Sequence, residues 1–248
     1  MIELIIIYFI LGFILEYLDS SLGGGYGTIL TPLLLGFGYP IMMIVPMILL
    51  SEIITGSLAT IFHHNYGNVE KKVLLYKLPF ALIGTICGVF IALSIPKIWL
   101  KVYIGLLIIT TGAIMLINWL RKIKISEKVS WKGVAVLGTI VGWNKSISGG
   151  GYGPISVAGL SLCGMNPKKS VGSTQLTEAI VCFVGLLLYL LTKSVIWNWD
   201  IAVPLIIGAS LATFPSAYTT HKIPKRKFGL MVAIFIIILG LNTLRKIL

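Results

Sequence analysis

The stretch that decides the fold is S-S-L-G-G-G-Y-G at Ser20–Gly27, and a second copy, S-I-S-G-G-G-Y-G, stands at Ser146–Gly153. The copies lie 126 residues apart, from Ser20 to Ser146, and each follows an apolar segment. Successive glycines interrupt a membrane helix and let the backbone turn sharply beside a ligand. Paired interruptions at matching positions of two halves point to the binding site of a membrane carrier. The two octets therefore predict both an architecture and a place for chemistry.

The composition predicts that lipid covers most of the surface. The chain is 57% hydrophobic and 11% charged, with a mean hydropathy of +0.98, whereas a soluble domain has about 25% charged residues. At about 20 residues per span, little of the chain is left for a soluble domain. The net charge of +12 is spread over short loops between apolar runs, which indicates membrane topology rather than nucleic-acid binding. The cysteine spacings indicate neither a metal site nor a disulfide framework, and the histidine pair is a weak metal signal.

We expect ten apolar segments, and two of them are unusually short. Residues 28–38 and 154–164 cannot span a bilayer alone. Each is therefore either a half-helix of a re-entrant element or a tilted helix that extends through the glycines. The expected segments are 2–18, 28–38, 40–62, 73–95, 98–119, 131–147, 154–164, 167–191, 199–220 and 227–244.

The repeat extends beyond the octets and predicts the fold. At the same offset, Glu52 matches Glu178. Each half has an odd number of segments, so the second half should be inserted upside down relative to the first. We predict an all-α polytopic membrane protein of two inverted repeats, each a glycine-broken or re-entrant segment pair plus three full transmembrane helices. The first repeat covers residues 1–122, the second covers 123–248, and residues 121–130 form a cytoplasmic linker.

The distribution of basic residues sets the predicted orientation. If the N-terminus is outside, most of the 20 Lys and Arg residues, Lys77 among them, fall in the cytoplasmic loops, as the positive-inside rule expects. Lys71 and Lys72 follow the third segment, whereas the counterpart loop has only Lys193 and Asp200. Both termini should therefore lie outside.

The octets are the predicted substrate site. A helix that starts after each break directs unbonded N–H groups and the positive end of its dipole back at the break. This arrangement binds an anion without a charged side chain. The alternative is that the glycines serve close helix packing, but their equivalent positions favour a substrate site. The candidate substrate-binding residues are Ser20, Ser21, Gly23, Gly24, Gly25, Tyr26, Asn144, Lys145, Ser146, Ser148, Gly149, Gly150, Gly151 and Tyr152.

Asp19 and Lys145 occupy equivalent positions beside the octets and carry opposite charges. If both octets reach the midplane, these two side chains approach each other across the pseudo-two-fold axis. Lys145 could then neutralise an anionic substrate, with Asn144 beside it as a hydrogen-bond donor. A structural ion pair and an interfacial lysine that snorkels to the headgroups remain open as alternatives.

Two glutamates lie in the middle of long apolar segments, where a charge is costly. Glu52 and Glu178 should each face the protein interior, and a carboxyl group there can load and release a proton. The alternative is a glutamic acid that stays protonated and hydrogen-bonds a backbone carbonyl. The candidates for proton coupling or path lining are Asp19, Glu52, Gln175 and Glu178.

The arrangement resembles the sulfite exporter TauE/SafE family, also called the TSUP permeases. The resemblance rests on Leu22–Gly27 with Thr31–Leu34, and on Ser148–Pro154; the duplication and the lysine-rich central loop extend it to the whole chain. It implies transport of small anions such as sulfite, thiosulfate or organosulfonates, an inner-membrane location and no redox cofactor. One departure is that Pro154 follows its glycines directly while Pro32 lies five residues after the first cluster, so the two half-sites need not be equal.

These observations predict a permease, not an enzyme, that moves a small sulfur-containing anion by alternating access. The substrate would bind at the midplane between the two breaks, with coupling to protons as an option. The predicted partners are the anion, the lipid bilayer and protons, and the oligomeric state stays open. The alternatives are a cation carrier or channel that uses Asp19, Glu16 and Glu52, and an integral membrane enzyme, for which no converging nucleophile and base is evident.

Overall fold

The computed structural model describes residues 2–120, 129–222 and 226–245. Every regular element within these residues is a helix, which confirms the all-α prediction. The predicted linker at 121–130 falls almost wholly outside the described residues. In chain order, the helices are α1 (Ile2–Leu22), α2 (Tyr26–Gly36), α3 (Ile41–Asn65), α4 (Lys72–Tyr76), α5 (Leu78–Ser94), α6 (Lys97–Leu120), α7 (Trp131–Ser148), α8 (Tyr152–Leu162), α9 (Pro167–Leu191), α10 (Trp199–Lys222) and α11 (Arg226–Arg245).

The helices follow the predicted segments closely, with one difference. The segment predicted at 73–95 is two helices, α4 and α5, which meet at Lys77. Pro79 explains the division, because a proline has no N–H to donate and its ring clashes with the carbonyl four residues earlier. The first turn of a new helix tolerates such a residue. Lys77 therefore lies at a junction of two helices rather than in a loop.

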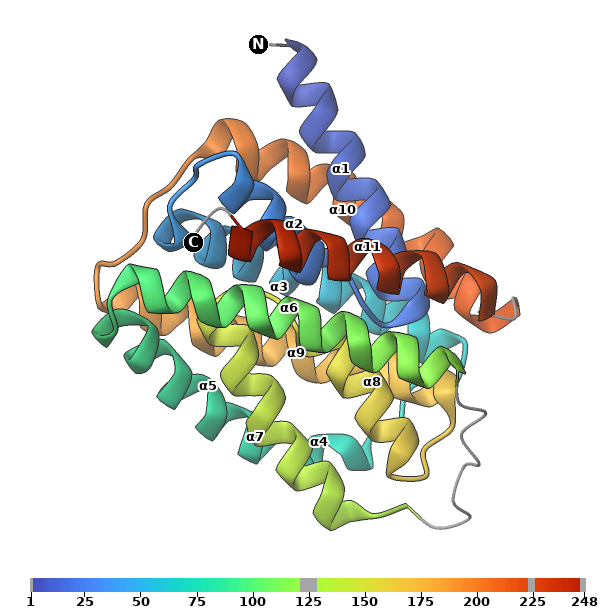
Figure 1. The fold of residues 1–248 in the computed structure, drawn as a ribbon. Helices are drawn as coiled ribbons and strands as arrows, with labels where there is room; N and C mark the ends of the chain where they lie inside the picture. Colours follow the sequence, from blue (N-terminus) through green and yellow to red (C-terminus); the bar gives the residue numbers. More distant parts are fainter. Residues whose placement is uncertain (1, 121–128, 223–225, 246–248) are drawn as a thin grey trace.

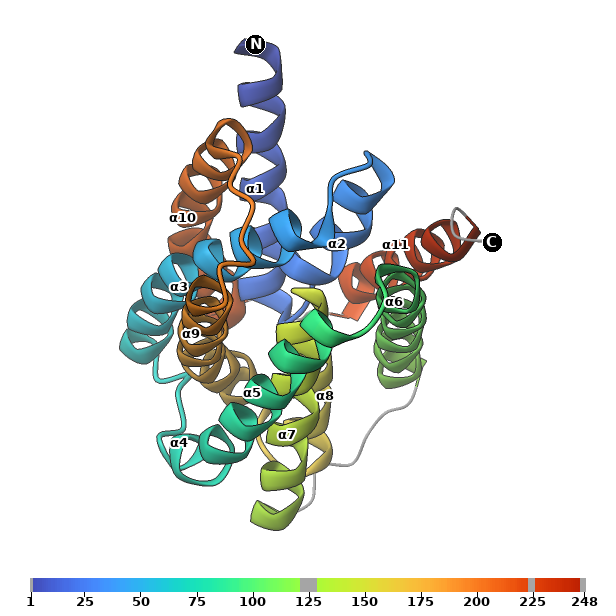
Figure 2. The ribbon, with the colours of Figure 1, turned by 90° about the vertical axis from the view of Figure 1, so that its left-hand side faces the viewer.

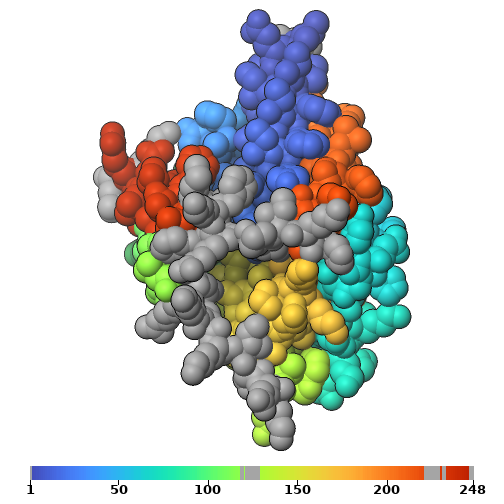
Figure 3. Space-filling view, turned by 90° about the vertical axis from the view of Figure 1, so that its right-hand side faces the viewer, coloured from blue at the N-terminus to red at the C-terminus, as the bar shows by residue number. Residues whose placement is uncertain are grey.

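The lengths and surfaces of the helices suit a membrane protein. In the described chain, four helices are long and apolar enough to span a bilayer: α3, α9, residues 97–117 of α6 and residues 199–220 of α10. Large apolar side chains such as Ile83 and Phe214 are exposed, as expected where lipid covers the protein. The first turns of α1, Ile2–Ile7, are exposed and stand clear of the other helices (Figure 3).

Each glycine cluster ends one helix and begins another. The breaks are only three residues long, Gly23–Gly25 and Gly149–Gly151. Gly149 and Gly151 have φ values of 70° and 76°, in the left-handed region that favours glycine. The following helices, α2 and α8, have 11 residues each, too few to cross a bilayer. The two short segments are therefore half-helices that start after a break.

The main helix pairings follow a two-fold pattern. α1 packs along α10 and α5 along α7, while α3 packs along α9 and α6 along α11 (Figures 1 and 2). In the predicted repeat, α1 corresponds to α7 and α5 to α10. Exchanging the halves thus maps the α1–α10 pair onto the α5–α7 pair, and it maps the α3–α9 pair and the α6–α11 pair each onto itself. This pattern supports an inverted repeat, which stays a prediction together with its orientation in the membrane.

The two breaks cross at close range because only glycine lies between them. A Cβ atom at Gly27 would overlap the carbonyl of Gly149, and one at Gly150 would crowd the carbonyl group of Gly27 in return. A Cβ atom at Gly153 would press on the backbone of Gly23 and Gly24. The first turns of α2 and α8 therefore meet backbone to backbone inside the protein.

We expect Gly27→Ala to destabilise the protein strongly, because its methyl group meets a backbone carbonyl that cannot rotate away. Overpacking of this kind costs about 1–3 kcal/mol or more. Gly185→Ala in α9 is the matched control, since its nearest neighbours are the side-chain ends of Leu49 and Thr85 at 3.3 and 3.4 Å. Thermal unfolding in detergent measures both variants. Equal transition temperatures for the two would show that the crossing is not tightly packed.

Candidate functional site

A lysine and two glutamates form an ion cluster beside the second break. Lys145, in the last turn of α7, is 1% exposed. Its ammonium group lies 2.8 Å from Oε1 of Glu178 and also pairs with Oε2 of Glu52. Both glutamates are buried, in the middle of α9 and α3. One ammonium group thus joins the end of α7 to the α3–α9 pair, and two carboxylates share it.

The Asp19 carboxylate caps the N-terminus of α2 at the first break. It accepts hydrogen bonds from the N–H of Gly25 at 2.9 Å and of Tyr26 at 3.4 Å, and from the amide of Gln175 at 3.0 Å. A carboxylate at a helix N-terminus satisfies N–H groups that have no partner within the helix and suits the dipole. The anion site predicted at the first octet is therefore filled by the protein itself. Asp19 and Lys145 each have other partners and do not form an ion pair.

The second break is held by neutral groups. The N–H of Gly150 donates to the Ser148 hydroxyl, and the N–H of Gly151 donates to the Thr28 hydroxyl on α2, both at 3.0 Å. Thr31 of α2 donates in turn to the carbonyl of Ser148 at 2.8 Å. Among the described residues, no carboxylate is hydrogen-bonded to the N–H groups of this break. The N–H groups of Gly150 and Gly151 are therefore bonded to neutral groups, while the Asp19 carboxylate lies against Gly153 in the first turn of α8, where a Cβ atom would be 2.9 Å from its Oδ1.

Most of the other predicted site residues are hydrogen-bonded within the protein, several of them in pairs that match between the halves. The hydroxyls of Tyr26 and Ser51 are hydrogen-bonded at 2.7 Å, and the equivalent hydroxyls of Tyr152 and Thr177 are bonded at 2.9 Å. The Ser20 carbonyl bonds to His63 at 3.0 Å, and the equivalent Ser146 carbonyl accepts from Tyr189 at 2.8 Å. Asn144 accepts from Tyr103 of α6, and the Ser21 carbonyl accepts from Thr220 of α10 at 2.9 Å. The octets are thus brought together as predicted, while the role of each residue in binding stays a prediction.

A second buried lysine lies beside the second break, although we predicted it in a cytoplasmic loop. Lys77 is 0% exposed, and its ammonium group donates to Ser156 at 2.5 Å and Thr177 at 3.0 Å. It also lies 4.4 Å from the ring centre of Tyr152, the first residue of α8. The ion pairs of the described residues involve other lysines, so the hydrogen-bond partners of this ammonium group are neutral, and Glu178 is the carboxylate that acts on it from farther away.

A signal for Lys77 was present in the sequence. The run V-L-L-Y-K-L-P-F at residues 73–80 places a lysine inside a segment that was itself predicted to be apolar and membrane-embedded. Charges inside such segments are rare and usually functional. The prediction for Lys77 was wrong because it assigned every lysine between apolar runs to a loop.

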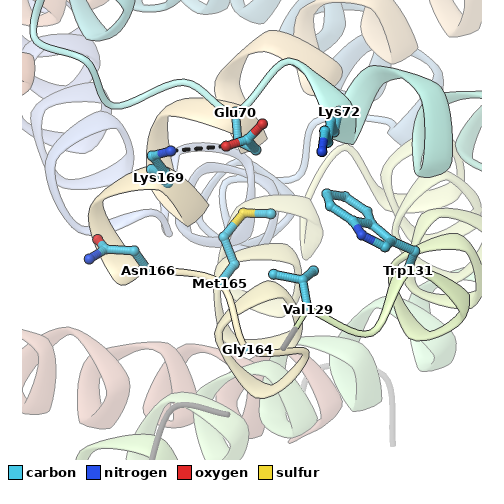
Figure 4. Close-up of a pocket in the computed structure, with 8 residues that line it drawn as sticks. All are labelled: Glu70, Lys72, Val129, Trp131, Gly164, Met165, Asn166 and Lys169. Atoms are coloured by element: carbon cyan, nitrogen blue, oxygen red, sulfur yellow. Dashed lines mark hydrogen bonds and ion pairs between the residues drawn. The ribbon is translucent and has the colours of Figure 1, made fainter. Parts of the chain in front are cut away.

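A separate surface pocket of about 210 Å³ lies near α4 and the loop between α8 and α9. Figure 4 shows Lys169 paired with Glu70, at 2.9 Å, with Lys72 and Trp131 farther along the wall. The hydrogen bond from Lys169 lowers the pKa of Glu70. Both partners are partly exposed, so the pair contributes little to stability. None of the break residues lines this pocket, and we place no part of the substrate site there.

The chain matches the family model described as sulfite exporter TauE/SafE over residues 8–243. It is 29% identical over 249 residues to the probable membrane transporter protein YtnM of Bacillus subtilis, covering 97% of this chain and 82% of that protein. It is 23% identical over 272 residues to a probable membrane transporter protein of Haemophilus influenzae, covering 99% and 100%. No solved structure matches the chain significantly. The family match confirms the resemblance drawn from the octets.

We expect Lys145→Met to lower the free energy of unfolding by about 3–5 kcal/mol, because it leaves two buried glutamates without their shared counter-charge. Replacing both Glu52 and Glu178 by Gln in the same chain should restore much of that loss. Lys101→Met is the control, since Lys101 is an exposed residue of α6. Thermal unfolding in detergent measures all three, and a wild-type transition for Lys145→Met would contradict the prediction.

Proposed function

The chain belongs to the sulfite exporter TauE/SafE family of membrane transporters, and we propose that it is a secondary transporter for a small sulfur-containing anion. The proposed substrates are sulfite, thiosulfate and simple organosulfonates. The anion binds at the midplane, between the two glycine breaks, and crosses by alternating access. The protein lies in the inner cell membrane with both termini outside.

The observation that carries this proposal is the buried ammonium group of Lys77. A buried ammonium group without an anion in direct contact is costly, and this one lies against Tyr152, where α8 begins. An anion bound at the break would supply that contact and accept charge-assisted hydrogen bonds. Lys145 already serves two glutamates, so Lys77 is the better placed of the two lysines to neutralise a substrate.

We propose unequal roles for the two breaks. At the first, the Asp19 carboxylate already occupies the N-terminus of α2. At the second, the N–H groups are held by the hydroxyls of Ser148 and Thr28, which an oxyanion can displace at lower cost than a carboxylate. The positions of Asp19 and Lys145 in the repeat favour the same assignment, because they carry the negative charge at the first break and the positive charge at the second.

The packing of the helix pairs supports alternating access. The α1–α10 pair and the α5–α7 pair are equivalent in the repeat, and both contact the central α3–α9 pair. Rocking of one outer pair against the centre would open one face, and rocking of the other would open the opposite face. The glycine crossing is the proposed pivot, since backbone contact there permits rotation without side-chain interlock.

A cation carrier that uses Asp19, Glu16 and Glu52 is the second candidate. Glu16 favours it, because neither of its buried carboxylate oxygens has a hydrogen-bond partner. Asp19 and Glu52 disfavour it, because they are already bound by Gln175 and Lys145. Uptake of Na⁺ or K⁺ without any anion would support the cation carrier over our proposal.

Lys77→Met should weaken anion binding while leaving the fold intact. The loss of a charged hydrogen bond worth about 1.5–3 kcal/mol weakens binding about 10- to 100-fold. The fold should survive because Ser156 keeps its hydrogen bond to Thr174 and Thr177 keeps those to its own helix. The measurement is binding and proteoliposome uptake of sulfite, thiosulfate, sulfoacetate and simple carboxylates, with thermal unfolding in parallel.

Lys71→Met is the matched control, because Lys71 is exposed six residues earlier in the chain. It should bind and transport as the wild type does. Unchanged binding in Lys77→Met would refute the site, whereas a wild type that binds and transports none of these anions would refute the substrate class.

A further inference from the structure

One acidic side chain in the interior has no partner within normal hydrogen-bond distance. Glu16, on α1 one turn before Asp19, is 1% exposed, and neither of its carboxylate oxygens makes a hydrogen bond within the described structure. Burying an ionised carboxylate without a donor or counter-ion costs many kcal/mol, and such a group normally takes up a proton instead. The unpartnered state of Glu16 therefore points to a ligand that the carboxyl group holds.

The surroundings of Glu16 are predominantly acidic. Asp19 and Glu178 act on it with like charge, and Lys145 acts with the opposite charge. The Thr55 hydroxyl of α3 acts on Glu16 as a donor from beyond normal hydrogen-bond distance. Like Oε2 of Glu178, it is buried and has no partner within that distance. Three unpartnered polar groups from α1, α3 and α9 are thus gathered in one region.

The remaining helices that pack against α1 add no cation to this region. α2 contributes the hydroxyl of Tyr26, which is bonded to Ser51. On α10, the charged side chain that the structure describes is Asp200, and it is exposed. On α3, Glu52 pairs with Lys145, and His63 lies against the Ser20 carbonyl. Lys145 is therefore the nearest positive charge, and it is already shared.

The other buried acids have donors within hydrogen-bond or ion-pair distance. Asp19 is bound by the Gly25 N–H and Gln175, while Glu52 and Glu178 share Lys145. Glu16 is the carboxyl group left over. A metal ion suits the place poorly, because within the described residues no three His, Cys, Asp or Glu side chains are arranged to hold one. A proton needs neither space nor several ligands.

We propose that Glu16 is the proton-binding site that couples anion movement to the proton gradient, an inference that rests on the proposed anion transport. In the structure described here, the carboxyl group is protonated and shut off from water. When the α1–α10 pair moves and water reaches the site, the proton leaves to water and the carboxylate is briefly solvated. After release of the anion, the empty carrier turns to the other side with this carboxylate ionised, its charge offset by the Lys77 ammonium group that the anion has left. It takes up a new proton there, so one proton crosses with each cycle.

Glu16→Gln tests the coupling, because an amide has nearly the shape of a protonated carboxyl group and cannot release a proton. In proteoliposomes, the variant should exchange labelled thiosulfate or sulfite across the membrane but lose the stimulation that a pH gradient gives to the wild type. Glu16→Asp should recover part of that stimulation. Glu3→Gln is the control on the same helix, since Glu3 is exposed, and it should respond as the wild type does.

A second measurement does not depend on transport. Infrared spectra of the purified protein should contain the carbonyl band of a buried carboxylic acid at neutral pH, and Glu16→Gln should lose it while Glu3→Gln keeps it. If the wild type carries no anion, the proposed function fails, but this band still decides whether Glu16 holds a proton. The inference is overturned if the band survives in Glu16→Gln, if that variant keeps its response to pH, or if a Na⁺ gradient drives wild-type uptake instead.

Discussion

The crossing of the two glycine breaks constrains the rest of the interior. Where Gly27 lies against Gly149 and Gly150, there is no room for a Cβ atom, so α2 and α8 approach as closely as two backbones can. This contact brings the ends of α1 and α7 to the same region, and with them Asp19 and Lys145. From there Lys145 reaches the two glutamates of α3 and α9. The polar network of the protein is thus a consequence of a packing contact between residues that have no side chain.

A common scaffold with unlike charges explains how two similar half-sites can differ in chemistry. The tyrosine after each break is held by a hydroxyl at the equivalent position of the following long helix, Ser51 or Thr177. The charged positions are what differ, since Asp19 folds back on its own break while Lys145 turns away towards the glutamates. Lys77 has no counterpart lysine in the second half and adds a charge beside the second break alone.

The sequence was sufficient for the helices, the half-helices and the family, because these depend on apolar periodicity and on glycine at the breaks. It could not predict which charged groups meet. Asp19 and Lys145 looked like a pair because the repeat made them equivalent, but equivalence across an axis does not determine which rotamer each side chain adopts. Lys77 was misplaced because the spacing of basic residues does not distinguish a residue in a loop from one at the junction of two helices. Glu16 could be noticed but not interpreted, since the lack of a hydrogen-bond partner is a property of three-dimensional packing.

The pairing of α1 with α10 also sets the order in which the protein can be assembled. Synthesis proceeds at about 5–20 residues per second, so α10, which begins at Trp199, emerges roughly 10–35 s after α1 is complete. During that interval the helix that carries Glu16 and Asp19 lacks its principal neighbour. The helix α1 is thus made well before it is fully packed, and its acidic residues must be tolerated by the insertion machinery or by lipid until α10 arrives. Biogenesis therefore limits where a protein of this design can place buried acids, independently of what its finished structure can stabilise.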